Sequence, residues 1–289
     1  MKPPVFEYIR PADLDQAIAA LGEGGVAPLA GGQSLMQELG RRHRRPRAVL
    51  DLNRLQELDY IAVGDDQVTL GALTRYRVVE RCAEVAERIA LLPEALSYVG
   101  HATIRHRGTV GGSLAYADPS GEFPCAAVVL DARIVLTSTG GSRTVSAEDF
   151  FIGPYSTVRT DTELITAIII GLPPAHVTWA VEEFSRRHRD YAVVAAEVGI
   201  GLDDSGRIDY ARIGVAGGGP TVRRHRSAED ALVGRIPTTA LIAHAAALVA
   251  EESSPIHSVH ADVEHRRHLV RVMTGRAISK ASTKRTGEL

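Results

Sequence analysis

The spacing of apolar residues predicts a helix near the start of the chain. Within residues 11–25, Leu14, Ile18 and Leu21 recur at intervals that place them on one helical face. A proline and an aspartate just before them suit the first turn, and Gly22 suits the end of the helix. We therefore expect a helix in this stretch.

The pattern that follows predicts strands and then more helix. Short apolar runs that end in turn or polar residues lie at 26–32 and 47–55, and the run at 60–74 alternates around the sequence GDD, which suits a hairpin. This order of elements is typical of a mixed α/β unit. Residues 76–100 return to a helical pattern, with an interruption expected at Pro93 because proline removes a helix hydrogen bond.

The second half of the chain reads mostly as strands. Residues 125–151 suggest an apolar segment, a strand, a Gly-Gly turn and another strand, and the β-branched run within 162–174 predicts a strand that two prolines stop. Those prolines mark the best domain boundary. Beyond them, residues 179–220 predict antiparallel strands, and residues 238–253 belong to the helices that follow.

Composition and charge exclude several classes of protein. With 45% hydrophobic and 24% charged residues, the chain has the composition of an ordinary globular protein. Its formal net charge of −2 argues against a nucleic-acid partner. Cys82 and Cys125 lie in no CxxC motif or metal spacing, so we expect no iron–sulfur cluster on this chain. The polar N-terminal stretch and the shortness of the apolar runs predict a cytoplasmic protein without an integral membrane segment.

The first candidate site is a glycine turn within residues 29–39. An apolar strand runs into Gly31 and Gly32, and Gln33, Ser34 and an apolar helical run follow. A strand that turns at glycines into a helix presents several backbone N–H groups on one side, an arrangement that favours a phosphate. The alternative is an ordinary strand-to-helix turn with a serine N-cap.

A second glycine turn repeats this chemistry. Gly111 and Gly112 are flanked by the hydroxyl residues Thr109 and Ser113. Two such turns in one fold can clasp a pyrophosphate from both sides, so the pair is more informative than either turn alone. Neither turn matches the G-x-G-x-x-G dinucleotide fingerprint or the P-loop, which indicates a different way of holding the ligand.

Polar and aromatic residues near these turns allow two interpretations each. Asp118 and Glu122 could accept hydrogen bonds from ribityl or ribose hydroxyls, or cap turns and face solvent. The basic run 186–189 could grip a phosphate or form a solvated face. Tyr191 could shield an aromatic ring or fill a core. The basic run 41–47 indicates surface or subunit-contact charge, and no chemistry is assigned to it.

Four motifs together resemble the medium, FAD-binding subunit of molybdenum hydroxylases, a family that includes subunits of aerobic carbon monoxide dehydrogenase and bacterial xanthine dehydrogenase. They are AGGQS, TIRHRGTVGGSLAYADPSGEFP, FSRRHRDYA and HADVEHRRHLVRVMTGRAI, in the family's order. The resemblance implies an α+β fold: a two-part FAD-binding domain of the vanillyl-alcohol-oxidase/PCMH type, then a C-terminal antiparallel sheet with helices. Three parts are expected. Residues 1–55 would form an N-terminal α/β FAD-binding subdomain, and residues 56–174 a central α+β FAD-binding subdomain. Residues 175–289 would form the C-terminal antiparallel sheet and its helices.

The same resemblance implies the residues that bind FAD. The pyrophosphate would lie between the two turns, hydroxyl groups of the cofactor would meet the two acidic side chains, and the tyrosine would neighbour the isoalloxazine ring. The implied residues are Leu29, Ala30, Gly31, Gly32, Gln33, Ser34, Leu35, Met36, Val99, Thr109, Val110, Gly111, Gly112, Ser113, Asp118, Glu122, Ile165 and Tyr191. No catalytic acid or base and no metal ligand are implied on this chain.

The resemblance also implies partners. A large subunit would carry the molybdenum cofactor, a small subunit would carry two [2Fe-2S] clusters, and this chain would pass electrons through FAD to an external acceptor in a dimer of heterotrimers. Two departures stand out: Glu182 and Glu183, where some relatives have a lysine, and Tyr116, where many have histidine. The four-cysteine insertion of some relatives is absent.

Two other functions are compatible with the sequence. The chain could be a self-sufficient FAD-dependent oxidoreductase that oxidises its own substrate, since related two-loop flavin folds occur in oxidases. It could also be a non-catalytic assembly module that has lost FAD. Both glycine turns are intact, which makes the assembly module the least expected of the three functions.

Overall fold

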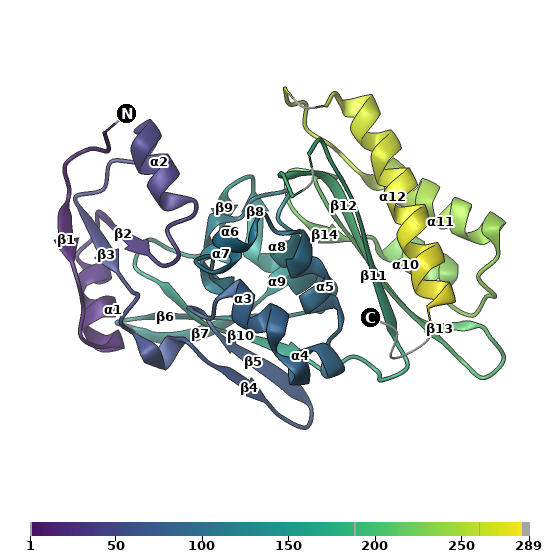
Figure 1. Ribbon diagram of the computed structural model, residues 1–289, viewed down its shortest axis with the longest axis horizontal. Helices are drawn as coiled ribbons and strands as arrows, with labels where there is room; N and C mark the ends of the chain where they lie inside the picture. Colours follow the sequence, from purple (N-terminus) through teal and green to yellow (C-terminus); the bar gives the residue numbers. More distant parts are fainter. Residues whose placement is uncertain (1, 188, 260, 285–289) are drawn as a thin grey trace.

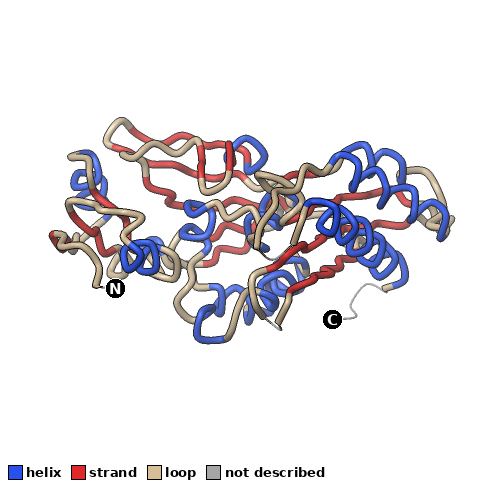
Figure 2. The backbone as a smooth tube through the Cα atoms, turned by 90° about the horizontal axis from the view of Figure 1, so that it is seen from above, coloured by secondary structure: helices blue, strands red, loops and turns tan. Residues whose placement is uncertain are grey.

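The computed structural model describes residues 2–187, 189–259 and 261–284. Its strands form three main sheets that lie one after another along the long axis of the molecule (Figure 1). Helices lie between and outside the sheets, as the view from above shows (Figure 2). The mixture of helices with one parallel and two antiparallel sheets confirms the expected α+β class.

The first sheet is small and parallel, with the strand order β1-β3-β2. The expected N-terminal helix is confirmed as α1, and the Asp13 side chain caps it by accepting a hydrogen bond from the Gln16 N–H. The elements of this part are β1 (Glu7–Ile9), α1 (Leu14–Gly22), β2 (Val26–Leu29), α2 (Leu35–Arg41), β3 (Ala48–Asp51) and the 3₁₀ helix η1 (Gln56–Leu58).

The second sheet is antiparallel throughout, with the order β4-β5-β10-β6-β7. The expected hairpin is confirmed as β4 and β5, and the β-branched run forms β10 at the centre of the sheet. The strands are β4 (Ile61–Val63), β5 (Gln67–Gly71), β6 (Arg133–Ser138), β7 (Gly141–Ser146) and β10 (Leu164–Gly171), and a separate pair comprises β8 (Phe151–Gly153) and β9 (Ser156–Thr157).

Helices between these strands cover the second sheet and differ in one respect from the expectation. The helical stretch breaks at Cys82 and again at Ile89, not at Pro93. Pro93 lies in the first turn of α5, where a missing N–H costs no hydrogen bond. The helices are α3 (Tyr76–Arg81), α4 (Ala83–Arg88), α5 (Leu91–Tyr98), α6 (Ala102–Arg105), α7 (Val110–Tyr116), α8 (Glu122–Val129) and α9 (Ala147–Phe150).

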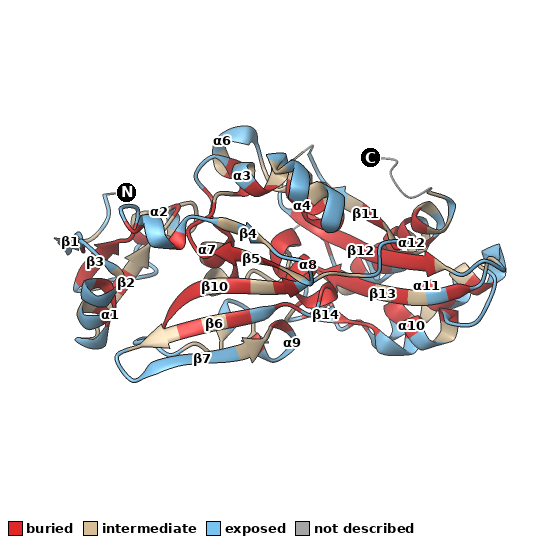
Figure 3. Cartoon of the chain, turned by 90° about the horizontal axis from the view of Figure 1, so that it is seen from below, coloured by how far each residue is buried: buried red, intermediate tan, exposed pale blue. Residues whose placement is uncertain are grey.

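The third sheet is antiparallel, with the order β11-β12-β13-β14. Helices α10 and α12 pack on its outer face, with α11 against both of them, while α5 and α8 cover the inner face. Strand β12 is therefore buried along almost its whole length (Figure 3). The elements are β11 (Thr178–Ser185), β12 (Ala192–Leu202), β13 (Ile208–Ala216), β14 (Arg223–Arg224), α10 (Arg226–Leu232), α11 (Thr239–Glu252) and α12 (Val263–Thr283).

The hydrophobic cores join neighbouring parts of the chain. Trp179 and Val181 of the third sheet pack into the core of the second, and Leu164 of β10 packs into the core of the first. The division into 1–55, 56–174 and 175–289 stays a prediction. No helix in the described part of the chain is long and apolar enough to cross a membrane.

Candidate cofactor-binding site

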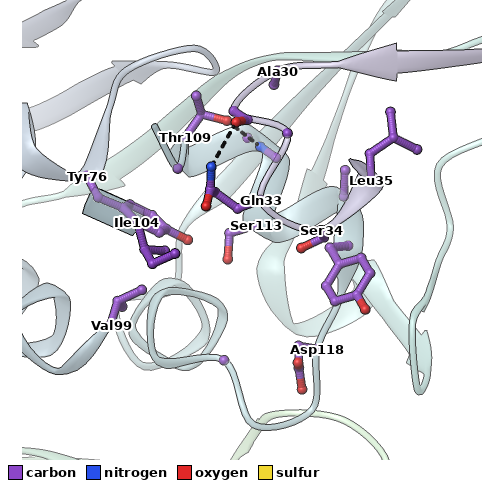
Figure 4. Close-up of a pocket in the computed structure, with 18 of the residues that line it drawn as sticks. Ala30, Gln33, Ser34, Leu35, Tyr76, Val99, Ile104, Thr109, Ser113 and Asp118 are labelled. Carbon is purple, nitrogen blue, oxygen red and sulfur yellow. Dashed lines mark hydrogen bonds between the residues drawn. The ribbon is translucent and has the colours of Figure 1, made fainter. Parts of the chain in front are cut away.

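The two glycine turns face a single cavity of about 420 Å³ (Figure 4). The first turn joins β2 to α2, and the second begins α7. Both are placed by short strands of the first and second sheets, which end beside the cavity. A cavity of this size, with mixed polar and apolar walls, is typical of a cofactor site.

The first turn leaves its backbone donors open. Gly32 adopts φ +74°, a conformation that favours glycine. Among the hydrogen bonds of the described chain, none uses the N–H groups of Gly32, Gln33 or Ser34. The Ser34 side chain makes no capping hydrogen bond to α2, although Ser34 occupies the N-cap position. The turn therefore presents donors to the cavity, as a phosphate requires.

The second turn is built differently. The Thr109 side chain accepts a hydrogen bond from the Gly112 N–H at 3.1 Å, and the Gly111 N–H donates to the Ala72 carbonyl at 2.9 Å. A Cβ atom at Gly111 would lie 2.6 Å from Ala72 Cβ. This glycine therefore allows α7 to pack against the end of β5. The second turn offers a tightly packed wall with the Ser113 side chain, rather than a second set of open N–H groups.

The segment before the second turn touches the first turn directly. A Cβ atom at Gly31 would overlap the Arg107 carbonyl oxygen and lie 2.8 Å from the carbonyl carbon. Arg75 donates a hydrogen bond to that same carbonyl, and a second one to Asn53. The distance between the two turns is thus set by backbone contact at Gly31.

Most of the residues implied by the resemblance line this cavity. They are Ala30, Gly31, Gly32, Gln33, Ser34, Leu35, Val99, Thr109, Gly111, Gly112, Ser113, Asp118, Glu122, Ile165 and Tyr191. Three do not: Leu29, Met36 and Val110. Val110 is fully buried in the core, and the Met36 side chain is half exposed on α2, because the helical turn directs these side chains away from the cavity.

Sequence reasoning missed an apolar wall of the cavity. Tyr76 and Ile104 stand beside Val99, opposite Leu35 (Figure 4). Tyr76 packs against the Phe123 ring at 5.8 Å between centroids, which fixes its orientation. Such residues look like ordinary core positions in sequence, since the wall forms only when α3, α5 and α6 meet.

A buried arginine supports this wall. Arg105 donates hydrogen bonds to the Val99 and Gly100 carbonyls at 3.1 and 2.7 Å, and to both carboxylate oxygens of Glu80 at 3.1 and 3.3 Å. Its side chain is almost completely buried. Arg105 therefore holds the loop that carries Val99 and Gly100 against α3. Its place in the RHRG sequence gave no sign of this role.

Arg105→Ala is expected to loosen this wall and destabilise the fold. Removing one partner of a buried ion pair typically costs about 3–5 kcal/mol of unfolding free energy. We expect a loss near the lower figure, because Arg77 still pairs with Glu80 at 2.8 Å. Urea unfolding of the variant tests this. Arg88→Ala, at an exposed position of α4, is the matched control, and equal stability of the two variants would contradict the assigned role.

Three glutamates gather where α8 covers the third sheet, and one of them, Glu122, lines the cavity. Strand alternation and register put Glu183 and Glu197 on the sheet face that α8 covers, and Glu122 lies on α8. Glu122 and Glu183 interact electrostatically, whereas Glu183 Oε2 and both carboxylate oxygens of Glu197 have no hydrogen-bond partner in the described chain. We call Glu122, Glu183 and Glu197 the carboxyl cluster. Glu122 and Glu197 are buried and Glu183 is half-buried, so Glu122 does not face solvent.

Burial raises the pKa of every member of the carboxyl cluster. Desolvation, with a contribution from Glu183, raises the pKa of Glu122 to about 8, and desolvation raises the pKa of Glu183 to about 7. The pKa of Glu197 is raised well above its usual value, mainly by burial. Asp118, at the cavity itself, also has a raised pKa because of burial, and its carboxylate accepts a hydrogen bond from the Ser120 N–H.

The segment after β11 reaches the outer part of the cavity. Arg189 and Tyr191 line it, while Arg186 and Arg187 are exposed and His188 lies outside the described residues. Tyr191 is 68% exposed and so does not fill a core. In the described chain, no group of three or more His, Cys, Asp or Glu residues is arranged to hold a metal ion.

Comparison with protein families gives matches over almost the whole chain. Residues 4–173 match the model described as "FAD binding domain in molybdopterin dehydrogenase", and residues 179–281 match "CO dehydrogenase flavoprotein C-terminal domain". Caffeine dehydrogenase subunit beta of Pseudomonas sp. (strain CBB1) is 38% identical, with 98% of this chain and 96% of that protein covered. The 6-hydroxypseudooxynicotine dehydrogenase complex subunit alpha of Paenarthrobacter nicotinovorans is 35% identical, with 97% and 96% covered.

Solved structures show the same fold. A chain of quinoline 2-oxidoreductase from Pseudomonas putida 86 superposes with a TM-score of 0.94 at 34% identity, and 98% of each chain is covered. A chain of carbon monoxide dehydrogenase from Hydrogenophaga pseudoflava gives a TM-score of 0.94 at 31% identity, with 97% of this chain and 98% of that chain covered.

Proposed function

This chain belongs to the family of FAD-binding medium subunits of molybdenum hydroxylases, and we propose that its two glycine turns hold the FAD pyrophosphate. The observation that carries the proposal is the first turn, whose N–H groups have no partner in the described chain and which lines the same cavity as the second turn. A dianionic pyrophosphate is the kind of group that such donors stabilise.

The residues around the cavity fit the rest of the cofactor. The apolar wall of Tyr76, Val99 and Ile104 suits an aromatic ring system, and Asp118 and Glu122 suit hydroxyl groups. Together with Ile165 and Tyr191, these residues would bind and orient FAD. The wall also excludes water from one side of the cavity. Leu29, Met36 and Val110 would support the turns from behind rather than contact the cofactor.

Bound FAD would supply the exchange of electrons between one-electron iron–sulfur centres and an external acceptor. The chain's own residues contribute binding and orientation, and no side chain is required as an acid or base in this role. The substrate would be oxidised on a large subunit that carries the molybdenum cofactor, and a small subunit would carry the [2Fe-2S] clusters. We further propose a dimer of heterotrimers in the cytoplasm.

An absorption spectrum of the complex, purified untagged from its native source, tests the proposal. We expect flavin absorption overlaid with iron–sulfur absorption, and two companion bands, one larger and one smaller, on a denaturing gel. Flavin on a chain that purifies alone and turns over its own substrate would instead establish the self-sufficient oxidoreductase. A colourless chain that takes up no added FAD would contradict both and favour the assembly module.

A further inference from the structure

A second hollow lies beside helix α3, outside the cofactor cavity. Its volume is about 720 Å³, and its walls come from residues 59–61 leading into β4, from residues 74–82 in and around α3, and from His106 after α6. Among the described residues, none lines both this hollow and the cofactor cavity. We call it the α3 hollow, and nothing in the proposed function uses it.

The α3 hollow exposes apolar side chains on a backbone that is fixed in place. Tyr60 and Val78 remain 38% and 49% exposed, and Ile61 adds a half-buried side chain. The Tyr60 carbonyl accepts hydrogen bonds from the Thr74 hydroxyl at 2.7 Å and from the Gly71 N–H at 2.9 Å. These bonds join the segment before β4 to the segment before α3, so the backbone that carries the exposed ring has a defined position. An aromatic face of this kind suits a planar ring.

Positive charge prevails on the walls of the α3 hollow. Three arginines stand against one aspartate, and a histidine adds a further positive charge when it is protonated. The neighbouring carboxylate of Glu80 pairs with Arg77 at 2.8 Å and with the buried Arg105 at 3.1 Å, so it does not cancel the excess. A concave surface with an excess of one sign of charge attracts ligands of the other sign. The charged side chains of the walls are Arg75, Arg77, Arg81, Asp59 and His106.

Two of the arginines have donors that the chain leaves unused. The Arg77 Nε atom is buried and has no hydrogen-bond partner in the described part of the chain. Arg81 lies one helical turn further along α3, is exposed, and forms no ion pair with any described residue. Arg75 differs, because its hydrogen bonds go to two uncharged acceptors and Asp59 stabilises its charge. Arg77 and Arg81 are therefore the two side chains that can receive an anion.

We propose that the α3 hollow binds an aromatic anion, a planar ring that carries a phosphate or a carboxylate group. Arg77 and Arg81 bind the oxyanion, because guanidinium groups match the geometry of both kinds of anion. The ring packs against Tyr60 and Val78, where binding removes apolar surface from water. A phosphate ester carries up to two negative charges and so gains more from the excess positive charge than a carboxylate does. The site does not depend on the cofactor assignment.

The test uses the full chain with excess FAD and three probes of similar shape: 1-naphthyl phosphate, 1-naphthoate and the neutral 1-naphthamide. Equilibrium dialysis should show the tightest binding for the phosphate and the weakest for the amide. Arg81→Ala is expected to weaken 1-naphthyl phosphate about ten-fold, as for the loss of a hydrogen bond to a charged group, and to leave 1-naphthamide unchanged. Arg88→Ala, exposed on α4 and outside the hollow, is the matched control and should bind like the wild type.

Cys82 reports directly on where the probe lies. It lines the α3 hollow and is partly exposed, whereas Cys125, the other of the two cysteines, is fully buried. Bound 1-naphthyl phosphate should therefore protect Cys82 from iodoacetamide, as measured by mass spectrometry of the digested chain. At ten times its dissociation constant the probe should slow alkylation about ten-fold, since about nine-tenths of the sites are then occupied.

Tyr60→Ala tests the apolar side of the site. It should weaken all three probes by a similar factor, because it removes packing surface and no charge. The proposal is overturned if the three probes bind equally, if Arg81→Ala binds 1-naphthyl phosphate like the wild type, or if the bound probe leaves Cys82 unprotected. It is also overturned if Cys82 reacts in the free chain but not in the assembled complex, because the hollow would then be a subunit contact.

Discussion

Gly31→Ala is expected to yield a chain that no longer retains FAD. A single added methyl group at this position would overlap the Arg107 carbonyl oxygen, and both groups belong to backbone rather than to flexible side chains. The overlap can be relieved only if the two glycine turns move apart. Because a pyrophosphate clasped from both sides depends on their separation, we expect FAD affinity to fall at least a hundred-fold, or about 3 kcal/mol.

Flavin absorbance per chain, measured after desalting and again after incubation with added FAD, is the readout. Gly40→Ala is the control: it makes the same substitution in the helix that follows the turn, at a position where a Cβ atom meets nothing within 4 Å. Circular dichroism should show both variants folded, with the control at least as stable as the wild type because alanine favours helix. Full flavin occupancy in Gly31→Ala would refute the two-turn site.

Raising the pH from about 5 to 8 is expected to weaken the folded state of the FAD-free chain, because of the carboxyl cluster. The folded-state pKa of Glu122 is about 8 and that of Glu183 about 7, both above an ordinary glutamate value. The unfolded chain therefore releases protons first as the pH rises. Stability is fully present below the unfolded pKa and is lost as pH rises through the folded values, by up to about 1.4 kcal/mol per pH unit for each proton retained.

Glu197→Gln separates this effect from other titrations. Glu197 is fully buried, has no hydrogen-bond partner among the described residues and has a pKa raised well above the usual value. The variant replaces it with a group that stays neutral. We expect the variant to equal or exceed the wild type at pH 8 and to show a flatter pH dependence, with similar stability near pH 5. Glu87→Gln, at an exposed position of α4, should keep the wild-type slope.

Urea unfolding at several pH values, followed by fluorescence, measures both curves. The chain has one tryptophan, Trp179, which is buried in the joint between the second and third sheets and so reports on the region that holds the cluster. If the free energy of unfolding depends on pH in the same way for the wild type and Glu197→Gln, burial of the Glu197 carboxyl group does not contribute to the pH dependence, and the prediction is wrong.

Local patterns predicted several of the elements that border the cavity. The hairpin and the β-branched central strand depend on short-range rules of turn and strand formation, and both form as expected. The second glycine turn also lies at the cavity, but its N–H groups are bonded within the chain instead of repeating the open donors of the first turn. Pro93 misled because proline disrupts a helix interior but not its first turn. Whether Pro93 lies in a helix interior or in a first turn depends on where the helix begins. Residues 82–91 carry no clear signal for a helix end or a helix start.

Contacts between distant segments could not be predicted in the same way. Gly111 looked like a phosphate contact, yet its lack of a side chain serves packing against Ala72. That residue directly follows strand β5, and only the fold brings it close to Gly111. Glu197 gave a local signal, as the one charged residue in the apolar run of β12. That signal could not identify Glu122 as a neighbour of Glu197, because the two residues come together only where α8 covers the third sheet.

The central place of β10 has a consequence for the order of events during protein synthesis. Strand β5 ends at Gly71, but its partner β10 begins at Leu164, so the ribosome needs on the order of 5–20 s to deliver the intervening chain. Until then β5 and β6 each present an unpaired edge, a state prone to wrong pairing. Because Tyr191 emerges later still, a complete cavity exists only after most of the chain has left the ribosome. Cofactor insertion is therefore a late event, and until β10 is made the strand edges of β5 and β6 must be protected from wrong pairing.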